Sequence, residues 1–169
     1  MDFNNLSTVR FQQLLKPAAL RIYSQIFPNS IIEDLREKGV KVHILDKEFG
    51  IDSLLHLETK QWISVQEKYR DNSCLRWGDF TQEYMNGDGS QGEWFKLGAQ
   101  LYFYGWANKD NTDFEKWFLM DILKYKLIIN QAGGIEKVGE LRENYRYGQA
   151  TFYTIPLEKI RSAFIQEKT

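Results

Sequence analysis

The most informative stretch of this sequence is residues 50–70, which read Gly-Ile-Asp-Ser-Leu-Leu-His-Leu-Glu-Thr-Lys-Gln-Trp-Ile-Ser-Val-Gln-Glu-Lys-Tyr-Arg. Residues 51–57 are rich in side chains that favour strands, and residues 62–69 alternate between apolar and polar side chains. The residues between these two segments are polar and suit a tight connection. The stretch therefore predicts a β-hairpin.

Three polar side chains are expected to meet at one end of this hairpin. Because successive side chains of a strand point to opposite faces, Gln66 and Lys68 share one face and Glu67 points to the other. In an antiparallel pair the start of one strand lies opposite the end of the next, which places Asp52 near Gln66 and Lys68. An acid, an amide and a lysine therefore converge without any assumption about the rest of the fold.

This arrangement resembles a known family. The active-site motifs of the PD-(D/E)XK nuclease superfamily, which includes many restriction enzymes and Holliday-junction resolvases, are similar to Gly50-Ile-Asp52 and Val65-Gln-Glu-Lys68. The resemblance implies a restriction-endonuclease-like fold in which the aspartate and the acid of the E-x-K segment hold a divalent ion. Carried over by position, Asp52 is a metal ligand, and Lys68 is the catalytic lysine beside the attacking water and the scissile phosphate. The implied ion is Mg²⁺, for which Mn²⁺ can substitute.

Gln66 departs from the commonest pattern of that family, in which this position holds Glu or Asp. A Q-x-K form resembles the Mrr-like branch of the superfamily, where the amide oxygen takes the ligand position, and an amide oxygen is an accepted ligand of Mg²⁺. The change still removes one negative charge, so a further acid is expected to complete the metal site. Glu83 is the first candidate, provided that its predicted strand at 80–84 pairs beside the Gln66 strand. Glu67 and Glu33 are the alternatives.

Length and composition indicate one globular domain. The chain has 169 residues, and 43% of them are hydrophobic. This is enough for one core of ordinary size, so we expect a single domain over residues 1–169. No apolar run approaches the length of a membrane span, and the first residues lack the features of a signal peptide. A cytoplasmic protein without membrane contact is the resulting expectation.

Charge and cysteine content bear on partners and cofactors. The formal net charge is −1, so any DNA contact must come from local patches rather than from overall basicity. Arg70, Arg76 and Lys96 lie in predicted loops or at strand ends and are the candidate DNA-binding residues. Cys74 is the single cysteine and the chain has 2 histidines, so a structural zinc site is not expected.

The remaining segments predict helices and strands around the hairpin. A helix covers residues 6–27, and Pro17 can divide it into two helices. A short helix or turn at 31–38 precedes a strand at 40–45, which completes a three-stranded antiparallel meander with the Asp52 strand at its centre. Further along, we expect loops at 70–78 and 86–92, a helical turn at 93–97, a strand at 100–106, a strand or helix entry at 114–120, a helix at 121–131, a strand at 150–155 and a helix at 157–166. This order predicts an α+β fold, with a mixed central sheet that contains the meander and is flanked by helices.

These features lead to two hypotheses about function. The first is a metal-dependent DNA endonuclease of restriction or resolvase type, with Asp52, Gln66, Lys68 and Glu83 as its site residues. The alternative is a catalytically degenerate protein of the nuclease fold that binds nucleic acid or protein. Because one small domain does not cut both DNA strands in one visit, the first hypothesis predicts a homodimer, with an exposed aromatic strand or the terminal helix as its interface.

Overall fold

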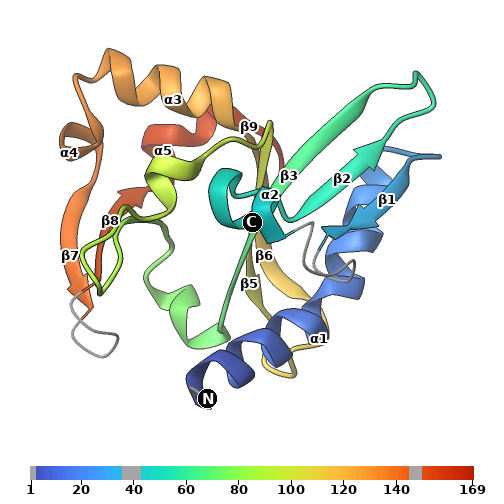
Figure 1. The fold of residues 1–169 in the computed structure, drawn as a ribbon, viewed down its shortest axis with the longest axis horizontal. Coiled ribbons are helices and arrows are strands. Elements are labelled where there is room, and N and C mark those ends of the chain that lie inside the picture. Colours follow the sequence, from blue (N-terminus) through green and yellow to red (C-terminus); the bar gives the residue numbers. More distant parts are fainter. Residues whose placement is uncertain (1–2, 36–42, 145–149) are drawn as a thin grey trace.

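A computed structural model of the chain describes residues 3–35, 43–144 and 150–169, and it has two sheets. The larger sheet consists, in spatial order, of β1 (Ile31–Asp34), β2 (Ser53–His56), β3 (Trp62–Arg70), β5 (Leu101–Ala107), β6 (Phe114–Asp121) and β9 (Phe164–Lys168) (Figure 1). The smaller sheet consists of β4 (Asp79–Met85), β8 (Ala150–Pro156) and β7 (Glu140–Asn144). Strands β3 and β5 pair in parallel and the other neighbours in the larger sheet are antiparallel. The mixed sheet flanked by helices confirms the α+β class.

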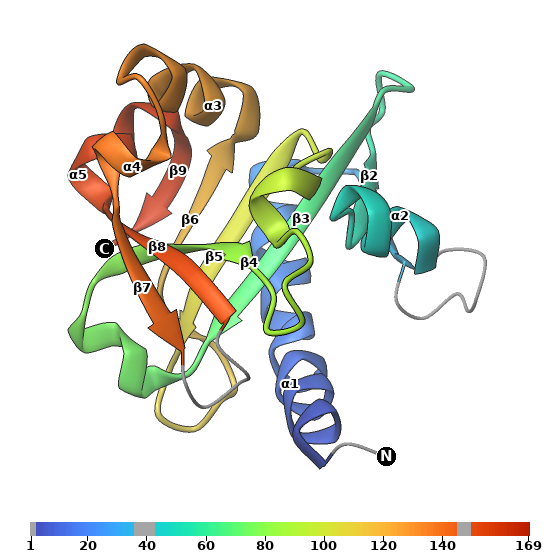
Figure 2. The same cartoon turned by 60° about the vertical axis from the view of Figure 1, so that its left-hand side comes forward.

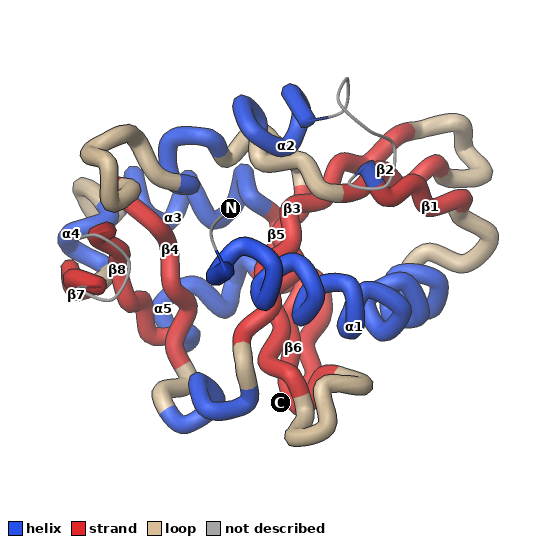
Figure 3. The backbone as a smooth tube through the Cα atoms, turned by 60° about the horizontal axis from the view of Figure 1, so that its bottom comes forward, coloured by secondary structure: helices blue, strands red, loops and turns tan. Residues whose placement is uncertain are grey.

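The helices are of very different lengths. They are α1 (Phe3–Ile26), α2 (His43–Phe49), α3 (Ile122–Gln131), α4 (Ile135–Val138) and α5 (Leu157–Ile160), with 3₁₀ turns η2 (Asn72–Arg76), η3 (Glu93–Lys96) and η5 (Arg161–Ala163). Helix α1 lies across one face of the larger sheet (Figure 3), while the smaller sheet and α3 pack on the opposite face (Figure 2). No helix in the described part of the chain is long and apolar enough to cross a membrane.

The central strand β5 divides the core in two. Tyr102 and Tyr104 pack with Phe80 of the smaller sheet, whereas Phe103 packs with Leu15 and other side chains on the α1 face. Every residue of β5 is buried, because helices or strands cover both faces of the sheet at this point. The aromatic strand is therefore not an exposed dimer interface, and that expectation is wrong.

The predicted hairpin is present, but the first strand of the meander is not where the sequence placed it. Strand β1 covers Ile31–Asp34, where a helix or turn was expected, and pairs with β2. The strand expected at 40–45 lies partly outside the described residues, and α2 begins at His43. A run of alternating residues as short as this fits either a strand or a helix, and pairing with β2 decides which segment extends the sheet.

Two further element predictions are corrected by tertiary packing. Helix α1 continues through Pro17 and does not divide there, although an interior proline costs a helix roughly 3 kcal/mol. Pro17 is exposed, while Leu15 and Ala18 beside it are fully buried against the sheet, and this packing keeps the helix in one piece. The helix expected at 157–166 is limited to α5 and η5, because Phe164–Lys168 instead pairs with the edge of β6. The terminal helix is therefore shorter than predicted.

Candidate functional site

Asp52 is held by the main chains of two neighbouring strands. It directly precedes β2, its N–H donates to the carbonyl of Val65 in β3 at 2.9 Å, and its own carbonyl accepts from the N–H of Leu35 at 3.0 Å. The Asp52 carboxylate oxygen Oδ2 accepts from the N–H of Glu67 at 2.6 Å. The hairpin therefore brings Asp52 to the Gln66–Lys68 segment, as strand geometry predicts.

Gln66 and Lys68 meet at an acid that the sequence analysis missed. Glu93, the first residue of η3, accepts from Gln66 Nε2 at 2.6 Å and from Lys68 Nζ at 2.9 Å. The same carboxylate accepts from Gln82 Nε2 at 3.0 Å and from the hydroxyl of Tyr102. Burial and the nearby Glu93 raise the pKa of Tyr102, so its hydroxyl stays a protonated donor.

The position of Glu93 depends on a close approach between backbones. Gly92 donates its N–H to the carbonyl of Tyr84 at 2.9 Å, and a Cβ on Gly92 would lie only 2.8 Å from the Tyr84 carbonyl carbon. The helical turn at 93–97 was predicted, but its first residue is marked only by the preceding glycine. That signal is too common to identify Glu93 from sequence.

Lys68 is a partly buried cation between two acids. Its side chain is 17% exposed, with Glu93 at 2.9 Å and Glu83 Oε1 at 3.8 Å. Burial by itself would lower the pKa of Lys68, but the carboxylates of Glu93 and Glu83 outweigh it and raise the pKa to about 12. Lys68 therefore carries a positive charge at neutral pH.

Glu83 reaches Lys68 by a different route from the one expected. Strand β4 does not pair beside β3; it belongs to the smaller sheet, which packs over the larger one. The condition set for Glu83 is therefore not met, yet sheet packing still brings its carboxylate to Lys68. The neighbouring residue Gln82 also contacts this site, because its Nε2 donates to Glu93, the acid that binds Gln66 and Lys68. The pairing of β4 becomes irregular directly after it, between Glu83 and Met85.

Gln66 has a buried oxygen that is not hydrogen-bonded. Its amide orientation follows from Glu93, because a carboxylate accepts only from the NH₂ side of the amide. The amide oxygen Oε1 is consequently directed away from Glu93, and it finds no hydrogen-bond donor among the described residues. A buried acceptor without a donor costs about 1–3 kcal/mol, which a cation bound to that oxygen would offset.

Gly50 lies directly against this amide. It adopts φ +61°, and a Cβ at this position would lie 2.9 Å from Gln66 Oε1. We predict that Gly50→Ala lowers the free energy of unfolding by both backbone strain and crowding of Gln66. Gly78 is the matched control because it also has φ +61°, but a Cβ added there would have no neighbouring atom within 4 Å. Urea denaturation should show that Gly50→Ala costs about 1–3 kcal/mol more than Gly78→Ala; equal costs would contradict the crowding.

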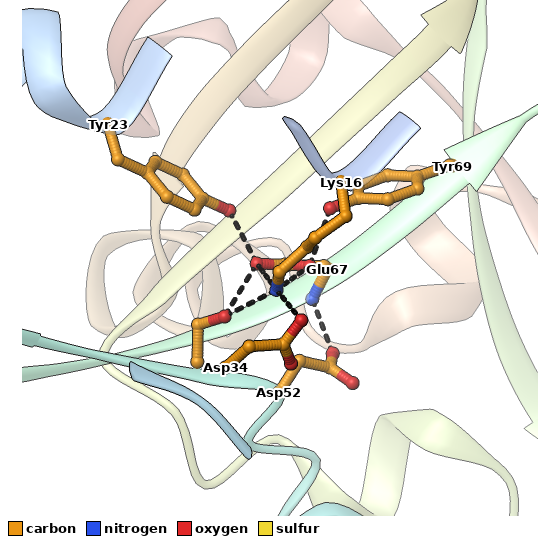
Figure 4. Close-up of polar contacts among 7 residues, drawn as sticks. Lys16, Tyr23, Asp34, Asp52, Glu67 and Tyr69 are labelled. Carbon is orange, nitrogen blue, oxygen red and sulfur yellow. Dashed lines mark hydrogen bonds and ion pairs between the residues drawn. The ribbon is translucent and has the colours of Figure 1, made fainter. Parts of the chain in front are cut away.

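Glu67 lies on the opposite face of β3 from Gln66, as strand alternation predicts. Its carboxylate accepts from Lys16 Nζ at 2.9 Å, Ser53 Oγ at 2.9 Å, the Tyr23 hydroxyl at 3.0 Å and the Tyr69 hydroxyl at 2.6 Å (Figure 4). These contacts commit the Glu67 carboxylate to the α1 side of the sheet. The other alternative acid, Glu33, lies in β1, which β2 separates from β3.

No contact joins the candidate DNA-binding residues to one another in the described part of the chain. Arg70, two residues beyond Lys68 in β3, is partly buried and donates to Cys74 Sγ at 3.6 Å. Arg76 lies over the exposed ring of Trp77, with the guanidinium carbon 4.4 Å from the ring centroid. Lys96 is the partly exposed last residue of η3. All of these side chains remain candidates for contact with a phosphate backbone.

The oxygen atoms of Asp52 and Gln66 suit a hard cation as ligands, although the acidic side chains around them do not form a cluster. Asp52 and Gln66 contribute a carboxylate and an amide oxygen, which are typical ligands of Mg²⁺. Within the described residues, no three His, Cys, Asp or Glu side chains are grouped as a metal site. Comparisons with protein-family models, curated proteins and solved structures gave no match for this chain.

Proposed function

We propose that this protein is a metal-dependent DNA endonuclease, hydrolysing phosphodiester bonds as restriction and resolvase-type enzymes do. The observation that carries the proposal is the buried Oε1 of Gln66, which has no hydrogen-bond donor in the described part of the chain. Gln66 lies between Val65 and Glu67, the two residues of β3 that hydrogen-bond to Asp52, and it precedes the charged Lys68 on the same strand. A carboxylate, a buried acceptor without a hydrogen-bond donor and a lysine are the kinds of group that metal-assisted phosphodiester hydrolysis uses.

Asp52 and Gln66 would hold the ion. When bound, Mg²⁺ or Mn²⁺ would supply an activated water and stabilise negative charge on the phosphate oxygens. Glu83 is the proposed third ligand, because its side chain is 49% exposed and lies next to Lys68 rather than being enclosed. Glu93 is 13% exposed and is already bonded to both Gln66 and Lys68, so it acts as a positioning residue for them.

Lys68 acts in this proposal as a cation. The carboxylates of Glu93 and Glu83 raise the pKa of Lys68 to about 12, so the side chain carries its proton at neutral pH. Its fixed ammonium group attracts the scissile phosphate and stabilises charge that develops on it. Glu93 fixes the direction of the ammonium group and keeps it charged.

DNA is the proposed partner, with Arg70, Arg76 and Lys96 as contacts to its phosphates. Because one such centre cuts one strand, we propose a homodimer for the cleavage of duplex DNA. The proposed compartment is the cytoplasm. Sedimentation of the protein with and without DNA tests the dimer, and monomer alone in both conditions would exclude it.

Ion binding tests the proposed centre without relying on cleavage. We predict that Asp52→Asn weakens Ca²⁺ binding, measured by calorimetry, by at least about 10-fold, because the substitution removes the charge of one ligand. The matched control is Asp110→Asn, which changes an exposed loop carboxylate in the same way. Wild-type protein that binds Ca²⁺ or Mn²⁺ with no dependence on Asp52 would contradict the assignment of this ligand.

One observation favours the alternative function, a degenerate nuclease-fold protein that binds nucleic acid or protein. Gln66 is neutral, and Glu93 is engaged by Lys68, Gln82 and Tyr102. This alternative predicts DNA binding without cleavage and without an Asp52-dependent ion. Incubation with plasmid, linear, single-stranded and four-way-junction DNA in Mg²⁺ or Mn²⁺ separates the two functions.

A further inference from the structure

A buried ion pair lies directly behind the proposed metal site, on the α1 face of the larger sheet. It is formed by Lys16 of α1 and Glu67 of β3, whose atoms Nζ and Oε2 are 2.9 Å apart (Figure 4). We propose that this pair positions Asp52 for the ion, so that helix α1 contributes to the site through the sheet. This inference rests on the proposed function and assigns Lys16 and Glu67 a role as positioning residues.

Three hydrogen bonds fix Asp52: two are made by its main chain and one by its carboxylate. Leu35, immediately after β1, donates to the Asp52 carbonyl, and Asp52 donates to Val65 in β3. The N–H of Glu67 donates to the Asp52 carboxylate. The direction of the carboxylate therefore depends on how β1 and β3 are placed relative to the start of β2.

Lys16 contacts a side chain from each of these three strands. Its Nζ lies 3.3 Å from Asp34 Oδ2 in β1, 2.7 Å from Ser53 Oγ in β2 and 2.9 Å from both carboxylate oxygens of Glu67 in β3. Asp34 precedes Leu35, and Ser53 follows Asp52, so the residues that Lys16 binds are sequence neighbours of those that hold Asp52. One ammonium group thus sets the spacing of the three strands around Asp52.

Glu67 connects the two faces of β3. Its main-chain N–H bonds to Asp52, while its carboxylate, with a side chain 0% exposed, is held on the α1 side. Tyr23 and Tyr69 donate to that carboxylate and their rings both pack edge-on against Phe103. A shift of the carboxylate would move the N–H of the same residue, and with it the hydrogen bond to Asp52.

The arrangement is more elaborate than stability alone requires. A buried ion pair is often replaceable by apolar side chains of similar volume without loss of stability, because desolvation offsets the attraction between the charges. Here the residue that pairs with Lys16 through its carboxylate is the one that bonds to the Asp52 carboxylate through its N–H. Residues that orient ligands from behind typically affect metal affinity 10- to 100-fold when mutated.

Calcium calorimetry on Glu67→Gln tests this role, since binding is read without cleavage. We predict that the substitution raises the Ca²⁺ dissociation constant by about 10- to 100-fold. Tyr69→Phe removes one hydrogen-bond donor to Glu67 and should raise the Ca²⁺ dissociation constant by roughly 2- to 10-fold. This milder variant provides the test if Glu67→Gln does not fold. The matched control is Ile129→Ala, which destabilises the core on the opposite face and should leave the dissociation constant unchanged.

The outcomes separate this inference from the proposed function. Wild-type Ca²⁺ affinity in both folded Glu67→Gln and Tyr69→Phe would overturn the positioning role while leaving the metal site in place. Equal loss of affinity in Ile129→Ala would also overturn it, because general destabilisation would then explain the effect. Absence of Ca²⁺ and Mn²⁺ binding in the wild-type protein would overturn the proposed function and this role together.

Discussion

Lys68→Met should lower the rate of DNA cleavage by about 10²- to 10³-fold and leave the protein folded. A preorganised charged donor at a site of developing negative charge typically contributes that much to the rate. Methionine keeps the apolar stem of the side chain but removes the ammonium group. The Glu93 carboxylate still accepts hydrogen bonds from Gln66, Gln82 and Tyr102, so this partly buried acid keeps its other partners.

Single-turnover cleavage of labelled DNA in Mg²⁺, with circular dichroism on the same preparation, measures both parts of this expectation. Lys60→Met is the matched control, because Lys60 is an exposed lysine in the turn of the same hairpin. Cleavage by Lys68→Met at the wild-type rate would exclude Lys68 from the reaction.

Lys16→Met should produce the largest loss of stability among single substitutions at the site. Lys16 is 8% exposed and contacts the carboxylates of Glu67 and Asp34, and its removal leaves negative charge buried without this cation. Breaking a buried ion pair by deleting one member typically costs about 3–5 kcal/mol of unfolding free energy. Methionine retains the volume and helix propensity of lysine, so the loss would come from the uncompensated charge.

Urea denaturation of Lys16→Met, Glu67→Gln and the double substitution distinguishes charge from packing. The double variant should recover part of the stability lost in Lys16→Met, because it no longer buries an unpaired Glu67 carboxylate. Lys109→Met, at an exposed loop position, is the control and should change stability by less than about 0.5 kcal/mol. A cost below about 1 kcal/mol for Lys16→Met would mean that the pair contributes little to folding.

Residues 50–70 predicted their own structure because the forces involved are local. Strand alternation and antiparallel pairing act within one hairpin. The approach of Asp52 to Val65 and Glu67, and the separation of Glu67 from Gln66, therefore needed nothing else. The same reasoning failed for Phe164–Lys168, where pairing with the edge of β6 overrides the helical pattern. It also allowed a break at Pro17, whereas Leu15 and Ala18 are buried against the sheet and α1 stays continuous.

The sequence by itself determined the α+β class, the hairpin and the approach of Asp52 to the main chain of the Gln66–Lys68 strand. Only the tertiary structure decided three contacts. Glu93 binds Gln66 and Lys68, Glu83 of the smaller sheet lies next to Lys68, and Lys16 of α1 pairs with Glu67 on the other face of β3. These contacts join residues far apart in the chain, with Lys68 and Glu93 separated by 25 positions and Lys16 and Glu67 by 51. No periodicity within a segment encodes them, because they arise when separate hydrophobic faces pack and bring their polar side chains together.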